Sequence, residues 1–321
     1  MKNLIACCLL VATSLIAQAS PVVIAHRGAS GYLPEHTLEA ATLAYSLGSD
    51  YIEQDLVLSK DGVAVVLHDI HLDTVTNVAK VFPNRHRDDG RYYVLDFTLA
   101  ELKQLKVHER KNQKGQQVYP ERYQGSGHFA IATFAEHIEL IANLNRQFSR
   151  QVGLYPEIKS PAWHRQQGYD ISKIVMTEIR AHNLDHKDAR IYLQCFDFAE
   201  IKRIAAEFKP VIPLVQLIGY RSDRTDYTYL QTAAGIKEMR QYVAGVGPAI
   251  PQLLVNNDSG LQATEFMQRL QASDLEIHPY THRIDQLPSG LSSEALLERL
   301  FAAGATGIFT DFPDQVTPHI P

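Results

Sequence analysis

The chain has 321 residues and a formal net charge of −5, and 45% of its residues are hydrophobic. This length suffices for one large domain or two small ones. The acidic balance and the lack of a Lys/Arg-rich run exclude the usual nucleic-acid-binding class. No apolar stretch beyond the N-terminus reaches the roughly 20 residues that a membrane-spanning helix needs, so no stable membrane insertion is expected.

Residues 1–19 have the pattern of a secretory signal peptide. Lys2 supplies a positive start, residues 4–16 are almost wholly apolar, and Ala-Gln-Ala at 17–19 forms an A-x-A cleavage site. We therefore expect cleavage before Ser20, export to the periplasm, and a single domain over residues 20–321. A lipobox-like Leu-Ile-Ala-Cys sequence ending at Cys7 is the alternative, but no apolar core precedes it.

Cleavage would also remove two of the three cysteines. Cys7 and Cys8 lie in the signal, and only Cys195 remains, so the mature chain can form no internal disulfide. We therefore expect a soluble exported protein whose stability comes from a large hydrophobic core.

Short β-branched or apolar runs alternate with amphipathic segments over nearly the whole chain. The expected strands are 22–26, 51–59, 63–69, 153–159, 190–196, 211–219, 251–257, 275–281 and 306–311. The expected helices are 37–47, 133–146, 171–182, 197–208, 261–272 and 292–303. No linker-like break divides them, so the pattern predicts one α/β domain, a TIM (β/α)8 barrel with a parallel sheet.

Residues 70–130 interrupt this alternation. The segment is polar, mixed in charge and too long for an ordinary connection. We expect an insertion with one short helix at 98–106, lying over the C-terminal face of the barrel. A disordered surface loop is the alternative, although Tyr92, Tyr93 and Phe97 favour partial order.

Polar residues recur in or at the ends of the expected strands, where the active site of a TIM barrel gathers. They are His26, Arg27, Glu53, Asp55, His68, Glu157, Lys159, Gln194 and Tyr280. Charged groups in such strands are costly unless they are paired or bind a metal. The sequence thus places the side chains that are most costly to bury at one end of the expected barrel.

Three of these side chains are carboxylates at strand spacing. Glu53 and Asp55 lie two apart on one strand and so share a face, about 6.6 Å apart along the backbone, and Glu157 is expected on another strand, which would converge with them if both strands face one pocket. Converging carboxylates repel, so a hard cation, Ca²⁺ or Mg²⁺, is one interpretation. Neutralisation by Lys159 and Arg27 in a structural network is the other.

The basic residues at the strand ends favour phosphoryl transfer. His26 and His68 can act as a proton acceptor and donor, while Arg27 and Lys159 suit an anionic phosphate. No nucleophile elbow, P-loop or H-E-x-x-H zinc motif is present. From residues 22–37 alone, His26 could equally be a core histidine and Arg27 a surface ion-pair member.

Several motifs occur in order from residue 22 to about residue 314: HRGASGYLPEHTLEA, DYIEQDLVLSKDGVAVVLHD, YPEIKSP, YLQCFD, IHPYTHR and GIFTDFPD. Together they resemble those of the glycerophosphodiester phosphodiesterases, above all the periplasmic bacterial branch. The resemblance implies a TIM barrel with a segment inserted after an early strand. It also implies a divalent cation, usually Ca²⁺, at the positions that match Glu53, Asp55 and Glu157.

The resemblance further implies the reaction. A glycerophosphodiester such as glycerophosphocholine would be hydrolysed to sn-glycerol 3-phosphate and an alcohol through a cyclic phosphate. The positions of His26 and His68 match the acid–base pair of the family, that of Arg27 its phosphate ligand, and that of Lys159 a lysine near the same phosphate. The preferred alcohol, the choice between Ca²⁺ and Mg²⁺, and the division of acid and base between the histidines stay open.

One position departs from many relatives, which carry P-E-N-T where this chain has His36 before Thr37. We expect His36 to shape the start of a helix and assign it no catalytic role. His137 is expected to be a solvated helix residue. Gln194, Phe196, Trp163 and Tyr280 either line the pocket or pack.

Two other functions compete with this interpretation. A phospholipase-type diesterase would need an apolar rim, and a non-catalytic exported binding protein would be expected to lack one of the site positions. The sequence leaves the oligomeric state open, a homodimer included.

Overall fold

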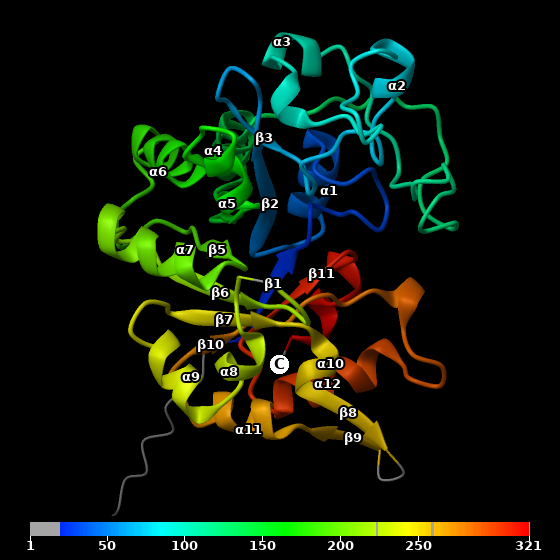
Figure 1. The fold of residues 1–321 in the computed structure, drawn as a ribbon. Coiled ribbons are helices and arrows are strands. Elements are labelled where there is room, and N and C mark those ends of the chain that lie inside the picture. The colour runs from blue at the N-terminus through cyan, green and yellow to red at the C-terminus, as the bar shows by residue number, and fades with distance from the viewer. Residues whose placement is uncertain (1–19, 223, 258–259, 321) are drawn as a thin grey trace, which may run out of the picture.

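The computed structural model describes residues 20–222, 224–257 and 260–320, so the expected signal peptide lies outside the described residues. Eight parallel strands form the sheet in the spatial order β10-β7-β6-β5-β4-β2-β1-β11 (Figure 1). They are β1 (Val22–Ala25), β2 (Tyr51–Leu58), β4 (Gly153–Ile158), β5 (Leu193–Cys195), β6 (Leu214–Ile218), β7 (Gly245–Pro248), β10 (Glu276–Ile277) and β11 (Gly307–Thr310).

The two outer strands of this order, β10 and β11, meet through backbone hydrogen bonds. The amide of Thr306 donates to the carbonyl of Ile277 at 2.9 Å, and that of Phe309 to Pro279 at 2.9 Å. The amide of His282 then donates back to Phe309 at 2.8 Å. These bonds close the sheet into a barrel, so the predicted TIM-barrel class is confirmed.

Helices pack their apolar faces on the outside of the barrel. The longer ones are α1 (Leu38–Ser46), α4 (Phe134–Phe148), α6 (Ile171–Ala181), α7 (Phe198–Arg203), α9 (Ala233–Met239), α11 (Glu265–Gln271) and α12 (Ser293–Ala302). In α6, Ile171, Val175 and Ile179 recur at helical spacing and are fully buried. Short helices join them: α2 (Val78–Val81), α3 (Leu99–Leu102), α5 (Pro161–Gln166), α8 (Tyr227–Leu230) and α10 (Ile250–Leu253). Within the described residues, no helix is long and apolar enough to cross a membrane.

Two of the expected strands lie outside the barrel. Residues 251–257 were predicted as a barrel strand, but β8 (Leu254–Asn257) pairs antiparallel with β9 (Gly260–Ala263) in a separate hairpin. The sixth barrel strand along the chain is instead β7, whose Gly-Val-Gly-Pro sequence has low β-propensity and gave no strand signal. Of the 63–69 run, only β3 (Ala64–Val66) is a strand, and it pairs antiparallel with β2.

The inserted segment is ordered and builds a small core of its own, so the expected partial order is confirmed. Figure 1 shows it in cyan beside β3 and α4. Phe97, Leu102 and Leu105 are nearly fully buried, and α3 begins with a Thr98 capping box within the expected 98–106 helix. The apolar residues of the insertion thus pack into a buried cluster, and the segment is not a loose loop.

Candidate active site

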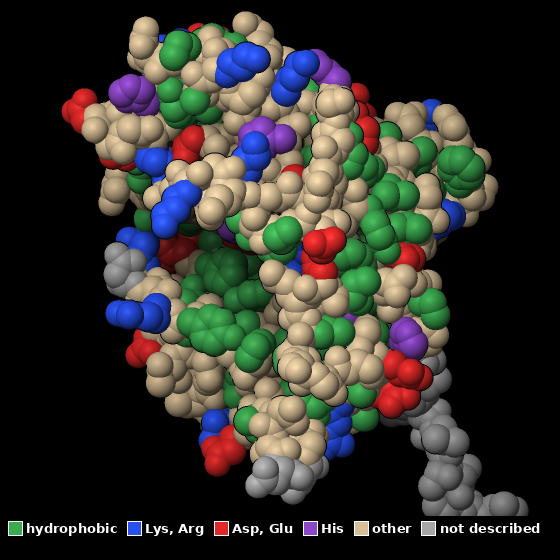
Figure 2. Space-filling model, turned by 90° about the vertical axis from the view of Figure 1, so that its right-hand side faces the viewer, with side chains coloured by type: hydrophobic (Ala, Val, Ile, Leu, Met, Phe, Trp, Pro, Cys, Tyr) green, Lys and Arg blue, Asp and Glu red, His purple; other side chains and the backbone are tan. Residues whose placement is uncertain are grey.

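A cavity of about 670 Å³ lies at the C-terminal ends of the barrel strands. Figure 2 shows a hollow in this face of the molecule with hydrophobic side chains along its wall. All seven residues singled out from the sequence line the cavity: His26, Arg27, Glu53, Asp55, His68, Glu157 and Lys159. On the opposite side its wall is apolar and includes Leu217, Ile250, Leu254, Leu261 and Leu291.

Strand register brings the three carboxylates together. Glu53 and Asp55 project from the same face of β2, and Asp55 lies opposite Glu157 of β4. Lys159, just beyond β4, places its Nζ 2.8 Å from Glu157 Oε1 and 3.5 Å from Asp55 Oδ1. Glu53 Oε2 accepts the backbone N–H of Arg27 at 2.6 Å. The three carboxylates and Lys159, which was expected to neutralise them, therefore lie together in one buried group.

Burial sets the protonation of these carboxyls. Burial raises the pKa of Glu157 to about 8, although the positive charge of Lys159 opposes this shift. The pKa of Glu53 is also raised well above its usual range by burial and by Asp55. Asp55 is buried too, but Lys159 and the neighbouring histidines hold its pKa well below the usual range.

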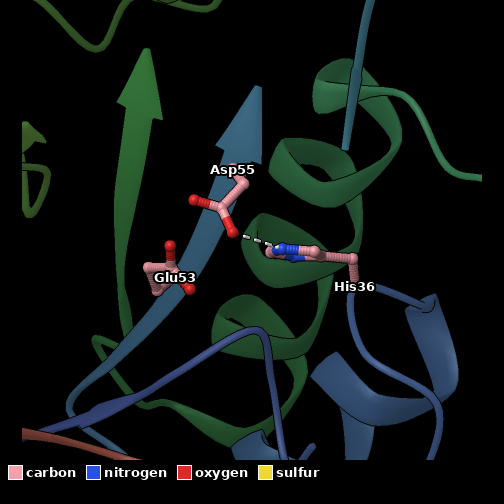
Figure 3. Close-up of side chains that lie close together, drawn as sticks. All are labelled: His36, Glu53 and Asp55. Atoms are coloured by element: carbon pink, nitrogen blue, oxygen red, sulfur yellow. Dashed lines mark hydrogen bonds and ion pairs between the residues drawn. The ribbon is translucent and has the colours of Figure 1, made fainter. Parts of the chain in front are cut away.

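A divalent cation fits the group formed by His36, Glu53 and Asp55. One ligand atom from each lies within 4.8 Å of the others, and Figure 3 shows the three side chains converging from β2 and the β1–α1 loop. Asp55 Oδ1 is buried and accepts no hydrogen bond, and its ion-pair partner Lys159 Nζ lies 3.5 Å away, so this oxygen keeps lone pairs that an ion could bind. Glu157 lies beside this group and contacts Lys159 instead.

Each of the two expected acid–base histidines is held by an aspartate. His26 Nδ1 lies 2.6 Å from Asp311 Oδ1, and His68 Nδ1 lies 2.8 Å from Asp69 Oδ1. Since a carboxylate only accepts hydrogen bonds, each Nδ1 carries the proton, which leaves each Nε2 with a lone pair.

Burial, followed by the charge of Arg27, lowers the pKa of both histidines. The values fall to about 4 for His26 and about 3 for His68. In both cases the neighbouring aspartate opposes the shift without cancelling it. Both side chains are therefore neutral near pH 7 and can accept a proton at Nε2.

The turn after β1 directs Arg27 into the cavity. Arg27 and Gly28 both have left-handed backbones, with φ of 60° and 80°. A Cβ at Gly28 would lie 2.8 Å from the carbonyl carbon of Ala40, so only glycine fits there. The guanidinium donates from Nη1 to Glu35, while its buried Nε has no hydrogen-bond partner. This Nε lies 3.5 Å from Asp55 Oδ2, so Arg27 also offsets part of the charge of the carboxylate group.

Two sequence expectations about histidines are corrected by the structure. His36 does more than shape a helix start, since its Nε2 lies 2.8 Å from Asp55 Oδ2 inside the candidate metal group. His137 is buried rather than solvated, and its Nε2 donates to the backbone carbonyl of His36 at 3.1 Å. The sequence carried no spacing signal for either contact, because His36 is a lone histidine before a helix cap and His137 is a lone histidine within a helix.

Other residues of the site were not assigned from the sequence. Asp69 and Asp311 each end a strand-like run, Leu-His-Asp and Phe-Thr-Asp, and that position at the strand end was the available signal. Gln194, Phe196 and Tyr280 line the cavity. Trp163 does not belong to the cavity lining and stacks on Tyr93, with ring centroids 5.7 Å apart.

Comparisons with known proteins agree with this geometry. Residues 26–315 match the profile of the Glycerophosphoryl diester phosphodiesterase family. The chain is 42% identical to a glycerophosphodiester phosphodiesterase of Haemophilus influenzae, over 92% of this chain and 89% of that protein. It is 33% identical to the enzyme of the same name from Treponema pallidum, over 91% of this chain and 90% of that protein.

Solved structures share the fold. A putative glycerophosphoryl diester phosphodiesterase from Silicibacter pomeroyi superposes with a TM-score of 0.70 at 22% identity, covering 94% of this chain and 93% of its own. A phosphodiesterase from Oleispira antarctica, in complex with the product sn-glycerol-3-phosphate, gives a TM-score of 0.63 at 23% identity, covering 94% of this chain and 96% of its own. At these identities, the similarity supports the barrel architecture.

Proposed function

The chain belongs to the glycerophosphoryl diester phosphodiesterase family, and from this premise we propose how its cavity hydrolyses glycerophosphodiesters to sn-glycerol 3-phosphate and an alcohol. One observation carries the proposal. Two histidines held by aspartates, a guanidinium and a buried carboxylate group line one cavity. Acid–base groups, a phosphate ligand and cation ligands are the parts that phosphoryl transfer needs.

The phosphate would lie between Arg27 and Lys159. The guanidinium of Arg27 supplies a hydrogen bond to a phosphate oxygen, and Lys159 supplies positive charge from the end of β4. A divalent cation, with Ca²⁺ as the first candidate and Mg²⁺ as the second, would be held by Glu53 and Asp55 with His36 or Glu157 beside them. When bound, it offsets charge on the phosphate and lowers the pKa of an oxygen ligand.

The histidines would move the protons. One histidine, neutral at Nε2, takes the proton of the glycerol 2-hydroxyl as that oxygen bonds to phosphorus. The other, protonated at Nε2 once the anionic substrate is bound, gives that proton to the alcohol oxygen as its bond to phosphorus breaks. The product is a cyclic glycerophosphate. Water then adds to phosphorus with the two roles reversed, which opens the ring and returns both histidines to their starting state.

The setting of the enzyme is part of the proposal. The A-x-A site at residues 17–19 supports cleavage before Ser20 and work in the periplasm. Analysis of the N-terminus of the protein recovered from cells tests it, since a chain that still begins at Met1 would contradict cleavage.

The direct test is an assay of residues 20–321 on glycerophosphocholine with Ca²⁺ or with chelator. We expect release of glycerol 3-phosphate with metal, and its loss by a factor of about 10² to 10⁴ in His26→Ala and Glu53→Ala. His86→Ala, which changes an exposed histidine of the insertion, serves as the matched control and should keep full activity. A folded, metal-loaded protein that cleaves no glycerophosphodiester would instead be a binding protein.

A further inference from the structure

The inserted segment sends two arginines back to the barrel, and each reaches one histidine–aspartate pair. Arg122 is buried, and its Nη2 donates to Asp311 Oδ2 at 2.7 Å. The other oxygen of that carboxylate, Oδ1, is the one that contacts His26 Nδ1. Arg122 thus stands directly behind the first histidine.

The second histidine has the same arrangement. Arg110 Nη1 donates to Asp69 Oδ2 at 2.6 Å, and Asp69 Oδ1 contacts His68 Nδ1 at 2.8 Å. Arg110 is fixed in turn by Glu35, which accepts from its Nε at 2.9 Å. In each pair, one carboxylate oxygen faces a histidine and the other faces an arginine of the insertion.

We propose that Arg110 and Arg122 are positioning residues for the reaction, so that the insertion is part of the active site rather than only a cover. This inference rests on the proposed function. By occupying Oδ2, each arginine leaves Oδ1 as the acceptor for the histidine and fixes the plane of the carboxylate. The imidazole then presents Nε2 to the cavity in one orientation.

The two sides differ in how many cations hold the aspartate. Asp311 Oδ2 accepts a second charged hydrogen bond, from Arg283 Nε at 2.7 Å. Arg110 is the cation that pairs with Asp69 within the described residues. Loss of Arg110 should therefore cost more activity than loss of Arg122, because Arg283 still holds Asp311.

Arg122 also clamps the insertion to the barrel through Asp285, which accepts from its Nε at 2.8 Å. If Arg122 had only a structural role, that role would be to hold the insertion against the barrel through Asp285. Asp285→Asn weakens the clamp without touching Asp311, so it separates the two roles. Arg87→Met is a second control, since Arg87 pairs with Asp96 inside the insertion.

The test measures first-turnover release from two diesters of glycerol phosphate, one with choline and one with p-nitrophenol as the alcohol. Choline oxygen needs a proton to leave and nitrophenolate does not. The arginine behind the acid histidine should therefore matter for the choline diester alone. The arginine behind the base histidine should matter for both diesters.

For Arg110→Met we expect release from the choline diester to fall about 10- to 100-fold with KM little changed, the usual effect of losing a partner behind a functional group. Release by Arg122→Met should fall less than release by Arg110→Met. Release by the double variant Arg122→Met with Arg283→Met should fall as far as release by Arg110→Met. Arg110→Lys and Arg122→Lys should recover part of the loss, and they carry the test if a Met variant does not fold. Asp285→Asn and Arg87→Met should stay near wild type.

The inference is overturned if the arginine variants release both alcohols at wild-type rates or lose no more than the two controls. It is also overturned if both arginine variants slow the two diesters by the same factor, because two histidines with opposite roles cannot give that result. A wild-type protein inactive on both diesters would instead refute the proposed function.

Discussion

Replacing Glu109 by glutamine should stabilise the protein above pH 7 and leave its stability below pH 5 unchanged. Glu109 lies in the insertion, is 6% exposed, and its Oε2 has no hydrogen-bond partner. Burial, and after it the charge of Glu35, raises the pKa of Glu109 from 4.5 to about 7. The folded protein therefore holds this proton more tightly than the unfolded chain does.

The sign and size of the effect follow from proton linkage. Between pH 4.5 and 7 the folded state binds more protons at this site, so the free energy of unfolding falls as the pH rises. A shift of about 2.5 pH units corresponds to about 3 kcal/mol, lost in full above pH 7. Glutamine does not ionise and so removes this loss.

Urea unfolding at pH 5 and pH 8 measures the effect. From pH 5 to pH 8, the free energy of unfolding of the wild type should fall by more than that of Glu109→Gln. Glu121→Gln, which changes an exposed glutamate of the insertion, should follow the wild type. Equal pH dependence of wild type and Glu109→Gln would refute the argument, since the buried carboxyl would then carry no ionisation cost.

Three further outcomes are expected. Thr133→Ala removes the capping box of α4 and should cost about 1 kcal/mol in urea unfolding, while the exposed Thr42→Ala should cost less. Ca²⁺ at 100 times its Kd should add about 2.7 kcal/mol to the free energy of unfolding, a gain that Glu53→Gln should abolish. The apolar wall of the cavity should lower the KM of diesters whose alcohol carries an alkyl chain, by at most about fourfold per buried CH₂; a flat chain-length series would contradict this.

The barrel was readable from the sequence where strands are apolar and helices periodic. It was not readable at β7, because two glycines and a proline pair in the sheet through their backbone while offering no β-propensity. Leu254 and Val255 carry a strand signal, but they pair antiparallel with β9 in a separate hairpin and not with the barrel. Tertiary context overrode local propensity at both places.

For the site, the sequence placed in one cavity the seven strand-end residues to which it gave a role, because parallel strands bring their C-terminal ends to one edge. It could not find the partners behind them. Asp311 meets His26 across 285 positions, and Arg122 arrives from a polar loop without periodicity. The first contact depends on the pairing of β1 with β11 and the second on how the insertion folds back, and no local pattern encodes either.

The pairing of β1 with β11 has a consequence for the order of events during synthesis. Val22 is among the first folded residues to be made, yet its partner Gly307 is among the last. At about 5 to 20 residues per second, the ribosome needs roughly 15 to 60 s to span that interval. The His26–Asp311 contact is made across the same seam. A nascent chain that lacks β11 therefore has neither a closed barrel nor the His26–Asp311 contact, so the site can be completed only once β11 has been made and has paired with β1.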